Sequence, residues 1–319
     1  MNKMDVVRAS YALFPVKHQA LWDLYEMAYR SFWTPSEIDL SRDRASLELI
    51  SDAERAQLFS VLAFFAASDV IVNDNLVVRF YAEIDLAEAR QFYAVQMAIE
   101  AIHTHVYASL IETLADARER DALFDGIENV PSVRAKARFA RKYTEPSRPL
   151  GERLIAYAFV EGVLFSSSFA CIFNLKKRGL FPGLTHSNDF IARDEGLHSR
   201  FSCAVYGVLC DTGAIERVPH ERIVEIAREA AEAELAFVAE SLVVPFLGMN
   251  AACMQVYVKY VTDYVLGMLG VERVYCVENP FDFMDLISLT SKTNFFEARV
   301  SEYAKPSNSD RRFALDAEF

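Results

Sequence analysis

Apolar residues recur every three or four positions along most of this 319-residue chain, whereas the alternation typical of strands is scarce. This spacing predicts long helices over residues 16–32, 51–81, 85–117, 152–178, 218–242 and 250–269. Between 118 and 150 the sequence is richer in Lys, Arg and Pro, and we expect a connector with one shorter helix there. Together these patterns predict an all-α fold in one large domain.

Short polar patterns predict where several helices begin. Three of them match a capping box: residues 34–37 (TPSE), Ser51 with Glu54, and Asp85 with Glu88. After 152–178, a turn through 179–186 leads to a further helix with Ser187 as its N-cap. Because the turn is short, we expect these two helices to be neighbours. The acidic run between 221 and 240 is interpreted as a solvated face.

Six ionisable residues interrupt strongly apolar helical runs. A Glu-x-x-His pair occurs twice, in QMAIEAIHTHVYASL and in IARDEGLH, and single acids interrupt VLAFFAASDVIV and AYAFVEGVLFSSSFACIF. A buried carboxylate costs several kcal/mol unless a cation or hydrogen bonds compensate it. A metal site would satisfy all six residues together, which are Asp69, Glu100, His103, Glu161, Glu195 and His198.

These residue types match one kind of metal site. A four-helix bundle can supply one carboxylate from each of two helices and a Glu-x-x-His from each of the other two, and these groups converge on two metal ions. Four carboxylates and two imidazoles suit iron or manganese better than structural zinc, which usually uses Cys. Buried ion pairs without metal are the competing interpretation. Tyr107 lies one turn beyond His103, although an isolated buried tyrosine is more often a core residue.

Composition and charge exclude several classes of protein. Hydrophobic residues make up 52% of the sequence, which is enough for a large core, and the net charge of -12 argues against a broad nucleic-acid surface. The five cysteines show no C-x-x-C pair and are typical of reduced thiols in the cytoplasm. The first residues, MNKMDVVRASYALFP, lack a long apolar stretch, and the longest apolar runs carry Asp69 or Glu161, so we expect neither secretion nor a membrane span.

The C-terminal residues lose the helical pattern. Residues 304–319 form a polar stretch that ends in FALDAEF. A disordered terminus is the default expectation, but Phe313, Leu315 and Phe319 suggest a short motif that orders on docking. The predicted organisation is a short segment 1–15, a helical domain 16–303 and a flexible tail 304–319.

Five stretches closely resemble the small subunit of class I ribonucleotide reductase of the eukaryotic and large-DNA-virus type: FFAASDVIVNDNL, EARQFYAVQMAIEAIHTHVYASLIETL, VEGVLFSSSFACIFNLKKRGLFPGL, SNDFIARDEGLH and FALDAEF. The resemblance implies a ferritin-like, cytoplasmic homodimer that uses oxygen to assemble a dimetal centre and a tyrosyl radical. By this resemblance, the six residues above bind two iron ions in an Fe-O-Fe centre, and manganese stays open as the metal.

The same resemblance implies further roles. Tyr107 would carry the radical, and Trp33 and Asp194 would form an electron-transfer route that reaches the metal through His103, with Arg193 beside it. Tyr303 would pass the radical to the large subunit. The residues expected in the radical pocket are Phe165, Phe169 and Ile191, and the residues expected to dock on the large subunit are Phe313, Leu315 and Phe319.

The large subunit would carry out nucleotide reduction and its allosteric control. The sequence shows no phosphate-binding glycine loop and no redox cysteine pair, in agreement with that division. Four residues depart from the family pattern without replacing a ligand, and of these Val70 and His105 are expected to affect the pocket or the dimer face; the four are Val70, Ala101, His105 and Asn174.

Two other functions stay open at this point. One is a dimetal oxidase that acts directly on a small substrate, and the other is an iron-storage or catalytically silent binding subunit. The tail and the Trp33 to Tyr303 set argue against the first. Retention of all six ligands and Tyr107 argues against the second.

Overall fold

The structure is a computed structural model that describes residues 13–75, 79–127, 130–241 and 249–284, and the elements within these ranges are helical. The long helices are α1 (Gln19–Arg30), α3 (Asp52–Asn75), α5 (Ala87–Leu114), α6 (Ala117–Ile127), α7 (Pro131–Thr144), α8 (Leu150–Val163), α9 (Ser166–Lys177), α10 (Pro182–Asp211), α11 (His220–Ser241) and α12 (Ala251–Met268). The short ones are η1 (Pro35–Glu37), α2 (Asp43–Ser46), η2 (Leu47–Leu49), α4 (Tyr81–Glu83) and η4 (Asp282–Met284). The all-α prediction is confirmed.

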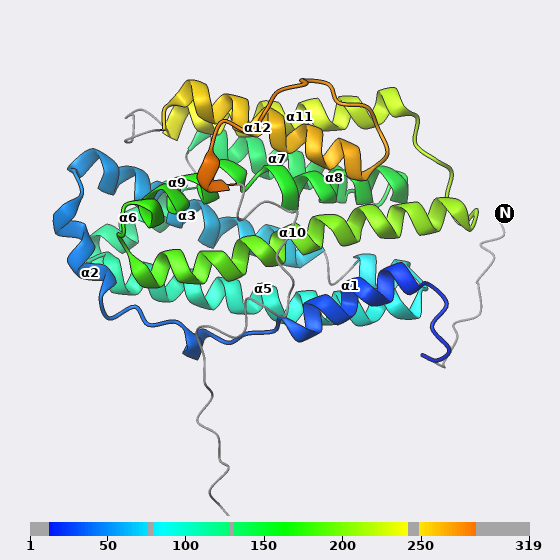
Figure 1. Ribbon diagram of the computed structural model, residues 1–319, viewed down its shortest axis with the longest axis horizontal. Coiled ribbons are helices and arrows are strands. Elements are labelled where there is room, and N and C mark those ends of the chain that lie inside the picture. The colour runs from blue at the N-terminus through cyan, green and yellow to red at the C-terminus, as the bar shows by residue number, and fades with distance from the viewer. Residues whose placement is uncertain (1–12, 76–78, 128–129, 242–248, 285–319) are drawn as a thin grey trace, which may run out of the picture.

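Helix α8 lies in the middle of the bundle (Figure 1). It packs along α10 on one side and against α7, α11 and α12 on the other. Helix α5 packs against α1, α3 and α10. The four helices that carry the predicted ligands, α3, α5, α8 and α10, are thereby joined around one apolar core.

One helical stretch, Leu150–Lys177, is long and apolar enough to cross a membrane. Within the part of the chain that the structure describes, 94% of the most apolar 18-residue part of this stretch is buried inside the protein. That burial is typical of a core helix, and length and composition alone are weak grounds for a span.

This stretch contains a break that the periodicity does not predict. The expected single helix over 152–178 is two helices, α8 and α9, separated at Leu164 and Phe165. The Leu164 N–H donates to the carbonyl oxygens of both Phe159 (3.3 Å) and Val160 (3.2 Å), so the last turn of α8 is widened. Apolar residues continue through the break, which explains why the pattern gave no signal.

The expected connector over 118–150 contains two helices instead of one. Helix α6 lies within its first part, and Pro131 begins α7 at the first helical position, where its missing N–H costs nothing. The interpretation of 221–240 as a solvated face is also wrong at one position, because Glu234 is fully buried.

Helix α10 begins at Pro182, so the prediction of Ser187 as its N-cap is wrong. The Asp43 carboxylate accepts hydrogen bonds from the N–H groups of Gly183 (2.7 Å) and Leu184 (2.6 Å), and it thus caps α10 from a distant segment. The Ser187 hydroxyl donates to the Leu184 carbonyl oxygen inside the helix (2.9 Å). A cap supplied from another part of the sequence leaves no local signal.

Two of the three predicted capping boxes form, at residues 34–37 and 51–54. The third, Asp85 with Glu88, is wrong. The Glu88 carboxylate instead accepts hydrogen bonds from the backbone N–H groups of residues 17 and 18 (2.6 and 3.2 Å), and it thereby fastens the start of α1 to α5.

Candidate metal centre

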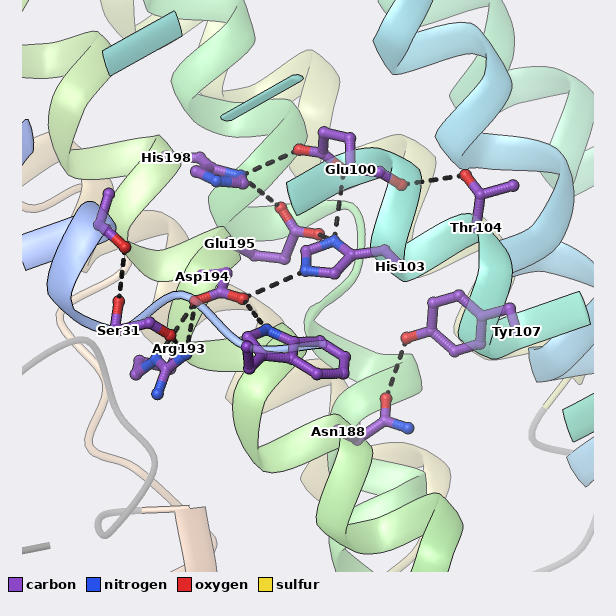
Figure 2. Close-up of polar contacts among 12 residues, drawn as sticks. Ser31, Glu100, His103, Thr104, Tyr107, Asn188, Arg193, Asp194, Glu195 and His198 are labelled. Atoms are coloured by element: carbon purple, nitrogen blue, oxygen red, sulfur yellow. Dashed lines mark hydrogen bonds and ion pairs between the residues drawn. The ribbon is translucent and has the colours of Figure 1, made fainter. Parts of the chain in front are cut away.

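Five of the six predicted ligands lie together in the core of the bundle. Glu100 and His103 come from α5, Glu161 from α8, and Glu195 and His198 from α10, and all five side chains are buried. Ligand atoms from the three glutamates and His198 lie within 4.8 Å of one another. Figure 2 shows four of the five residues, with the side chains from α5 and α10 facing each other.

Both histidine rings point the same nitrogen at the carboxylates. The His103 Nδ1 atom lies 3.3 Å from Glu100 Oε2 and 3.1 Å from Glu195 Oε1. The His198 Nδ1 atom lies 3.0 Å from Glu100 Oε1 and 3.1 Å from Glu195 Oε2. The spacing of three residues places each histidine beside its own glutamate, and packing of α5 on α10 joins the two pairs.

The buried carboxylates and imidazoles of this cluster shift one another's protonation. Burial, and then the charges of Glu195 and Glu100, raise the pKa of Glu161 well above its usual range. Burial alone would lower the pKa of His198, but Glu100 and Glu195 outweigh it and raise that pKa to about 9. Burial would raise the pKa of Glu195, whereas hydrogen bonds from His103 and His198 hold it below its usual range.

The donor atoms fit a metal. Glu161 Oε2 is buried without a hydrogen bond, and Glu100 Oε1 and His103 Nδ1 have ion-pair neighbours but no hydrogen bond of normal geometry. A cation would satisfy all three atoms, and oxygen and imidazole donors suit iron or manganese. Asp69 lies in α3, but its side chain is outside the described part of the structure. The buried cluster can therefore hold a metal ion.

The second ring nitrogen of His103 faces a different group. His103 Nε2 lies 3.3 Å from Asp194 Oδ2, and the same oxygen accepts a hydrogen bond from Trp33 Nε1 (2.8 Å). Arg193 donates to the other oxygen of Asp194 (2.9 Å). Burial alone would raise the pKa of Asp194, but Arg193, His103 and Trp33 together lower it. A carboxylate in this place fixes the orientation of a metal-binding imidazole.

Tyr107 is fully buried one turn beyond His103 on α5. Its hydroxyl donates to Asn188 Oδ1 (3.0 Å), as Figure 2 shows. Its ring stacks on Phe65, with centroids 4.5 Å apart and planes 6° apart. Phe165 and Phe169 pack against that same Phe65 ring, at 5.8 and 5.1 Å.

Sequence reasoning missed three polar or aromatic residues at the site. Gln96 donates from Nε2 to the Tyr157 hydroxyl (2.8 Å) and lies one turn before Glu100. Asn188 lies two turns before Glu195, so its polar side chain on a ligand-bearing face was a usable signal. Phe65 is indistinguishable by pattern from the other core phenylalanines.

Some of the remaining predicted residues lie in the described part of the structure and the others lie outside it. Ile191 is buried on α10, and Asn174 is buried on α9, whereas Ala101 and His105 are exposed on α5. His105 therefore faces outward and does not line the Tyr107 pocket. Outside the described residues lie the Val70 side chain, Tyr303, Phe313, Leu315 and Phe319.

The five cysteines, predicted as reduced core thiols, differ in burial, because Cys171 and Cys203 are buried whereas Cys276 is exposed. All five cysteines lie within the ranges that the structure describes, and they are free thiols. Burial raises the pKa of Cys171 and of Cys203 to about 12, so both thiols stay protonated and unreactive at neutral pH.

Comparison with known proteins shows the family to which the chain is similar. The family model described as "Ribonucleotide reductase, small chain" matches residues 10–280. The protein is 47% identical over 316 residues to the ribonucleoside-diphosphate reductase small chain of Yaba-like disease virus, a match that covers 95% of the viral protein and 97% of this chain. It is 45% identical over 318 residues to one of the small chains of the same enzyme from Arabidopsis thaliana, a match that covers 92% of the plant protein and 97% of this chain.

Among solved structures, the Rnr4 homodimer of the ribonucleotide reductase from Saccharomyces cerevisiae superposes with a TM-score of 0.79 and 30% identity, covering 90% of the yeast protein and 92% of this chain. Three observations point to the same family. They are the helical ferritin-like fold, the buried cluster of carboxylates and histidines, and the sequence match over nearly the full length of the chain. This chain belongs to the ribonucleotide reductase small-chain family.

Proposed function

We propose that this small subunit of ribonucleoside-diphosphate reductase generates and stores a tyrosyl radical at Tyr107. The radical would then pass to the large subunit for the reduction of ribonucleotides to deoxyribonucleotides. The observation that carries the proposal is the position of Tyr107, which is fully buried, stacked on Phe65 and one helical turn from His103 of the cluster.

The chemistry of the ligands supports a pair of iron ions. With oxygen, such a pair would supply a one-electron oxidant next to Tyr107, and a pair containing manganese is the alternative that the same ligands suit. The residues that would hold the metal ions are Asp69, Glu100, His103, Glu161, Glu195 and His198.

Tyr107 would give one electron and its phenolic proton to that oxidant, because the amide oxygen of Asn188 is too weak a base to keep the proton. The hydrogen bond to Asn188 Oδ1 fixes the direction of the hydroxyl (3.0 Å). Phe65 stacks on the ring, Phe165 and Phe169 pack against Phe65, and all three are buried, as is Ile191 on α10. These apolar residues would exclude water from the ring. A dry pocket protects a radical from reduction by solutes, so these residues would lengthen its lifetime.

Electrons would reach the cluster along Trp33, Asp194 and His103. These three side chains form a continuous row, because Asp194 Oδ2 contacts Trp33 Nε1 at 2.8 Å and His103 Nε2 at 3.3 Å. Arg193 holds the other carboxylate oxygen in place. The row begins close to the surface turn after α1 and ends at a predicted ligand.

The remaining roles concern partners. We propose that the protein forms a homodimer in the cytoplasm and that Tyr303 conducts the radical toward the large subunit. Phe313, Leu315 and Phe319 would dock that subunit. The Rnr4 relative was solved as a homodimer, which supports the first of these proposals.

The test is electron paramagnetic resonance on iron-reconstituted, oxygen-exposed protein, together with metal quantification. We expect a tyrosyl signal in the wild type and its loss in Tyr107→Phe, with about two metal ions per subunit in both. Tyr93→Phe is the matched control, because Tyr93 is also buried on α5 but its hydroxyl makes no hydrogen bond. That variant should keep the signal.

Three outcomes contradict parts of the proposal. An unchanged signal in Tyr107→Phe refutes the assignment of the radical to Tyr107. Bound metal without a tyrosyl signal in the wild type favours an oxidase that acts on its own substrate. Failure to bind metal favours a catalytically silent subunit.

A further inference from the structure

The break between α8 and α9 is held by two charged residues from other helices. Lys136 on α7 donates from Nζ to the carbonyl oxygen of Leu164 (2.7 Å), the residue that follows α8. Glu234 on α11 accepts a hydrogen bond from the Ser167 N–H (3.0 Å) and another from the Ser167 hydroxyl, in the first turn of α9. Both ends of the broken helix therefore have a partner from elsewhere in the fold.

The two partners are themselves an ion pair. Lys136 Nζ lies 2.7 Å from Glu234 Oε2, and the side chains are 3% and 0% exposed. The cation lies at the carboxyl end of α8, where helix dipoles favour positive charge, and the anion at the amino end of α9, where they favour negative charge. One buried pair thus caps both half-helices with the favourable sign.

Lys136 also contacts rings that lie behind the one stacked on Tyr107. Lys136 Nζ lies 3.7 Å from the centroid of Phe64 and 3.6 Å from that of Phe237. The Phe64 ring packs against Phe165 (5.6 Å) and against Phe65 (5.8 Å). Phe65 is the ring that stacks on Tyr107, so the cation supports the second layer of that pocket.

Stability alone does not account for such a pair. Burying two charges costs several kcal/mol each, and apolar side chains of similar size often give an equally stable protein. What apolar side chains cannot do is bind the free carbonyl of Leu164 and the free N–H of Ser167 at the break. The pair therefore specifies a geometry, three residues after the predicted ligand Glu161 and beside Phe165.

We propose that Lys136 and Glu234 are positioning residues that fix the break, and thereby set the direction of Glu161 toward the metal cluster and of Phe165 toward the Tyr107 pocket. The part that concerns the Tyr107 pocket rests on the proposed radical function. Control of the break does not, because it is a property of the metal-free protein.

The test compares Lys136→Met, the double variant Lys136→Met/Glu234→Met and the wild type. The double variant removes both charges, so it leaves no unpaired buried ion and is expected to fold even where the single variant does not. Lys142→Met is the matched control, because Lys142 and Glu229 pair across the same two helices (2.6 Å) but are 36% and 35% exposed.

The first measurement is amide hydrogen exchange in the metal-free proteins. In the double variant we expect exchange at residues 164–168 to be about tenfold faster or more, while α5 and α10 exchange as in the wild type, because only local opening is affected. The Lys142→Met control should match the wild type throughout. Two results would overturn the proposal that the pair controls the break. One is an exchange rate at residues 164–168 of the double variant equal to that of the wild type, and the other is faster exchange over the whole protein.

The second measurement is the line shape and lifetime of the tyrosyl signal after loading with iron and oxygen. We expect the double variant to show an altered line shape and a lifetime shortened about tenfold, an effect that a purely structural role in a folded protein would not produce. A wild-type line shape and lifetime overturn the link to the pocket. Absence of the signal from the wild type itself contradicts the proposed function and leaves the exchange measurement to decide the role of the pair.

Discussion

At the scale of single residues, His103 connects two networks through its two ring nitrogens. Its Nδ1 faces Glu100 and Glu195, and its Nε2 faces Asp194. Asp194 also accepts a hydrogen bond from Trp33. A substitution of Trp33 would therefore change how strongly Asp194 interacts with the His103 ring, although Trp33 itself is not a predicted ligand.

Replacement of Trp33 by Phe removes the hydrogen bond that the indole N–H donates to Asp194. We expect radical formation in iron-loaded protein to slow by about 10-fold to 100-fold, the factor that corresponds to ~1.5–3 kcal/mol for a hydrogen bond to a charged group. Stopped-flow absorbance after oxygen mixing measures the rate. The control is Trp22→Phe, which changes the other of the two tryptophans, on α1. Equal rates in the two variants would count against the proposed route.

His198 predicts how the metal-free protein responds to pH. Burial opposes its protonation, but Glu100 and Glu195 outweigh burial and raise its pKa from 6.5 to about 9. The native state then binds more protons than the unfolded state between these values, so this contribution is complete below pH 6.5 and is lost as pH rises to 9.

We therefore expect the Tm of metal-free protein to fall from pH 6.5 to 9, and the free energy of unfolding to fall by at most about 1.4 kcal/mol per pH unit for one proton. The slope should be shallower in His198→Asn, which cannot be protonated. Thermal melts by circular dichroism in a chelator measure both slopes. A variant as steep as the wild type would assign the effect to other groups.

The sequence predicts five residues of the buried cluster well and their surroundings less well. Glu100 and His103 are recognisable because polar residues at helical spacing interrupt an apolar face. Phe65 and Lys136 are not recognisable, because a phenylalanine in a core pattern and a lysine in a basic segment look like a packing residue and a surface residue. Only tertiary packing gives them a place at the site.

At the scale of elements, the start of α10 shows how closely two segments approach. A Cβ atom added to Gly183 would lie 2.4 Å from the carbonyl oxygen of Asp39, a backbone atom that cannot turn aside. In the same helix, a Cβ atom on Gly207 would meet nothing within 4 Å. The first position therefore rejects a side chain, whereas the second has room for one.

We expect Gly183→Ala to lower the free energy of unfolding by about 1–3 kcal/mol, because overpacking displaces backbone. Gly207→Ala should raise it by about 0.5–1 kcal/mol, because alanine restricts the unfolded state and suits a helix. Urea denaturation of both variants measures the difference. Equal stability of the two would show that residue 39 gives way at little cost.

The helix pattern in the sequence located most elements to within a few residues, since an amphipathic or fully apolar helix is recognisable by its spacing. It failed at α8 and α9, where the break depends on Lys136 and Glu234 from other helices. It also failed at the start of α10, where the cap comes from Asp43. Local patterns carry no information about partners that are distant in sequence.

At the scale of the whole molecule, the proposed function gives the helical body and the C-terminal residues separate tasks. The cluster and Tyr107 lie within the bundle core, whereas the proposed docking residues 313–319 follow the last described element, η4. Loss of the C-terminal residues should therefore affect partner binding without changing the cluster.

Deletion of residues 313–319 is expected to abolish complex formation with the large subunit and reductase activity, while the tyrosyl signal and metal content stay as in the wild type. Analytical ultracentrifugation with the large subunit measures the first, and electron paramagnetic resonance the second. A control variant keeps FALDAEF and replaces the polar residues 307–309 by glycine. Undiminished association of the truncated protein would show that the large subunit docks elsewhere.

The Asp43 cap also bears on the order in which the protein is made. Asp43 precedes Gly183 by 140 residues, so it leaves the ribosome long before α10 does. The residue that caps the helix of Asn188, Asp194 and a Glu-x-x-His pair is thus already present when that helix emerges, because synthesis runs from the N-terminus. In a circular permutant that begins between Asp43 and Gly183, α10 would be synthesised before the residue that caps it.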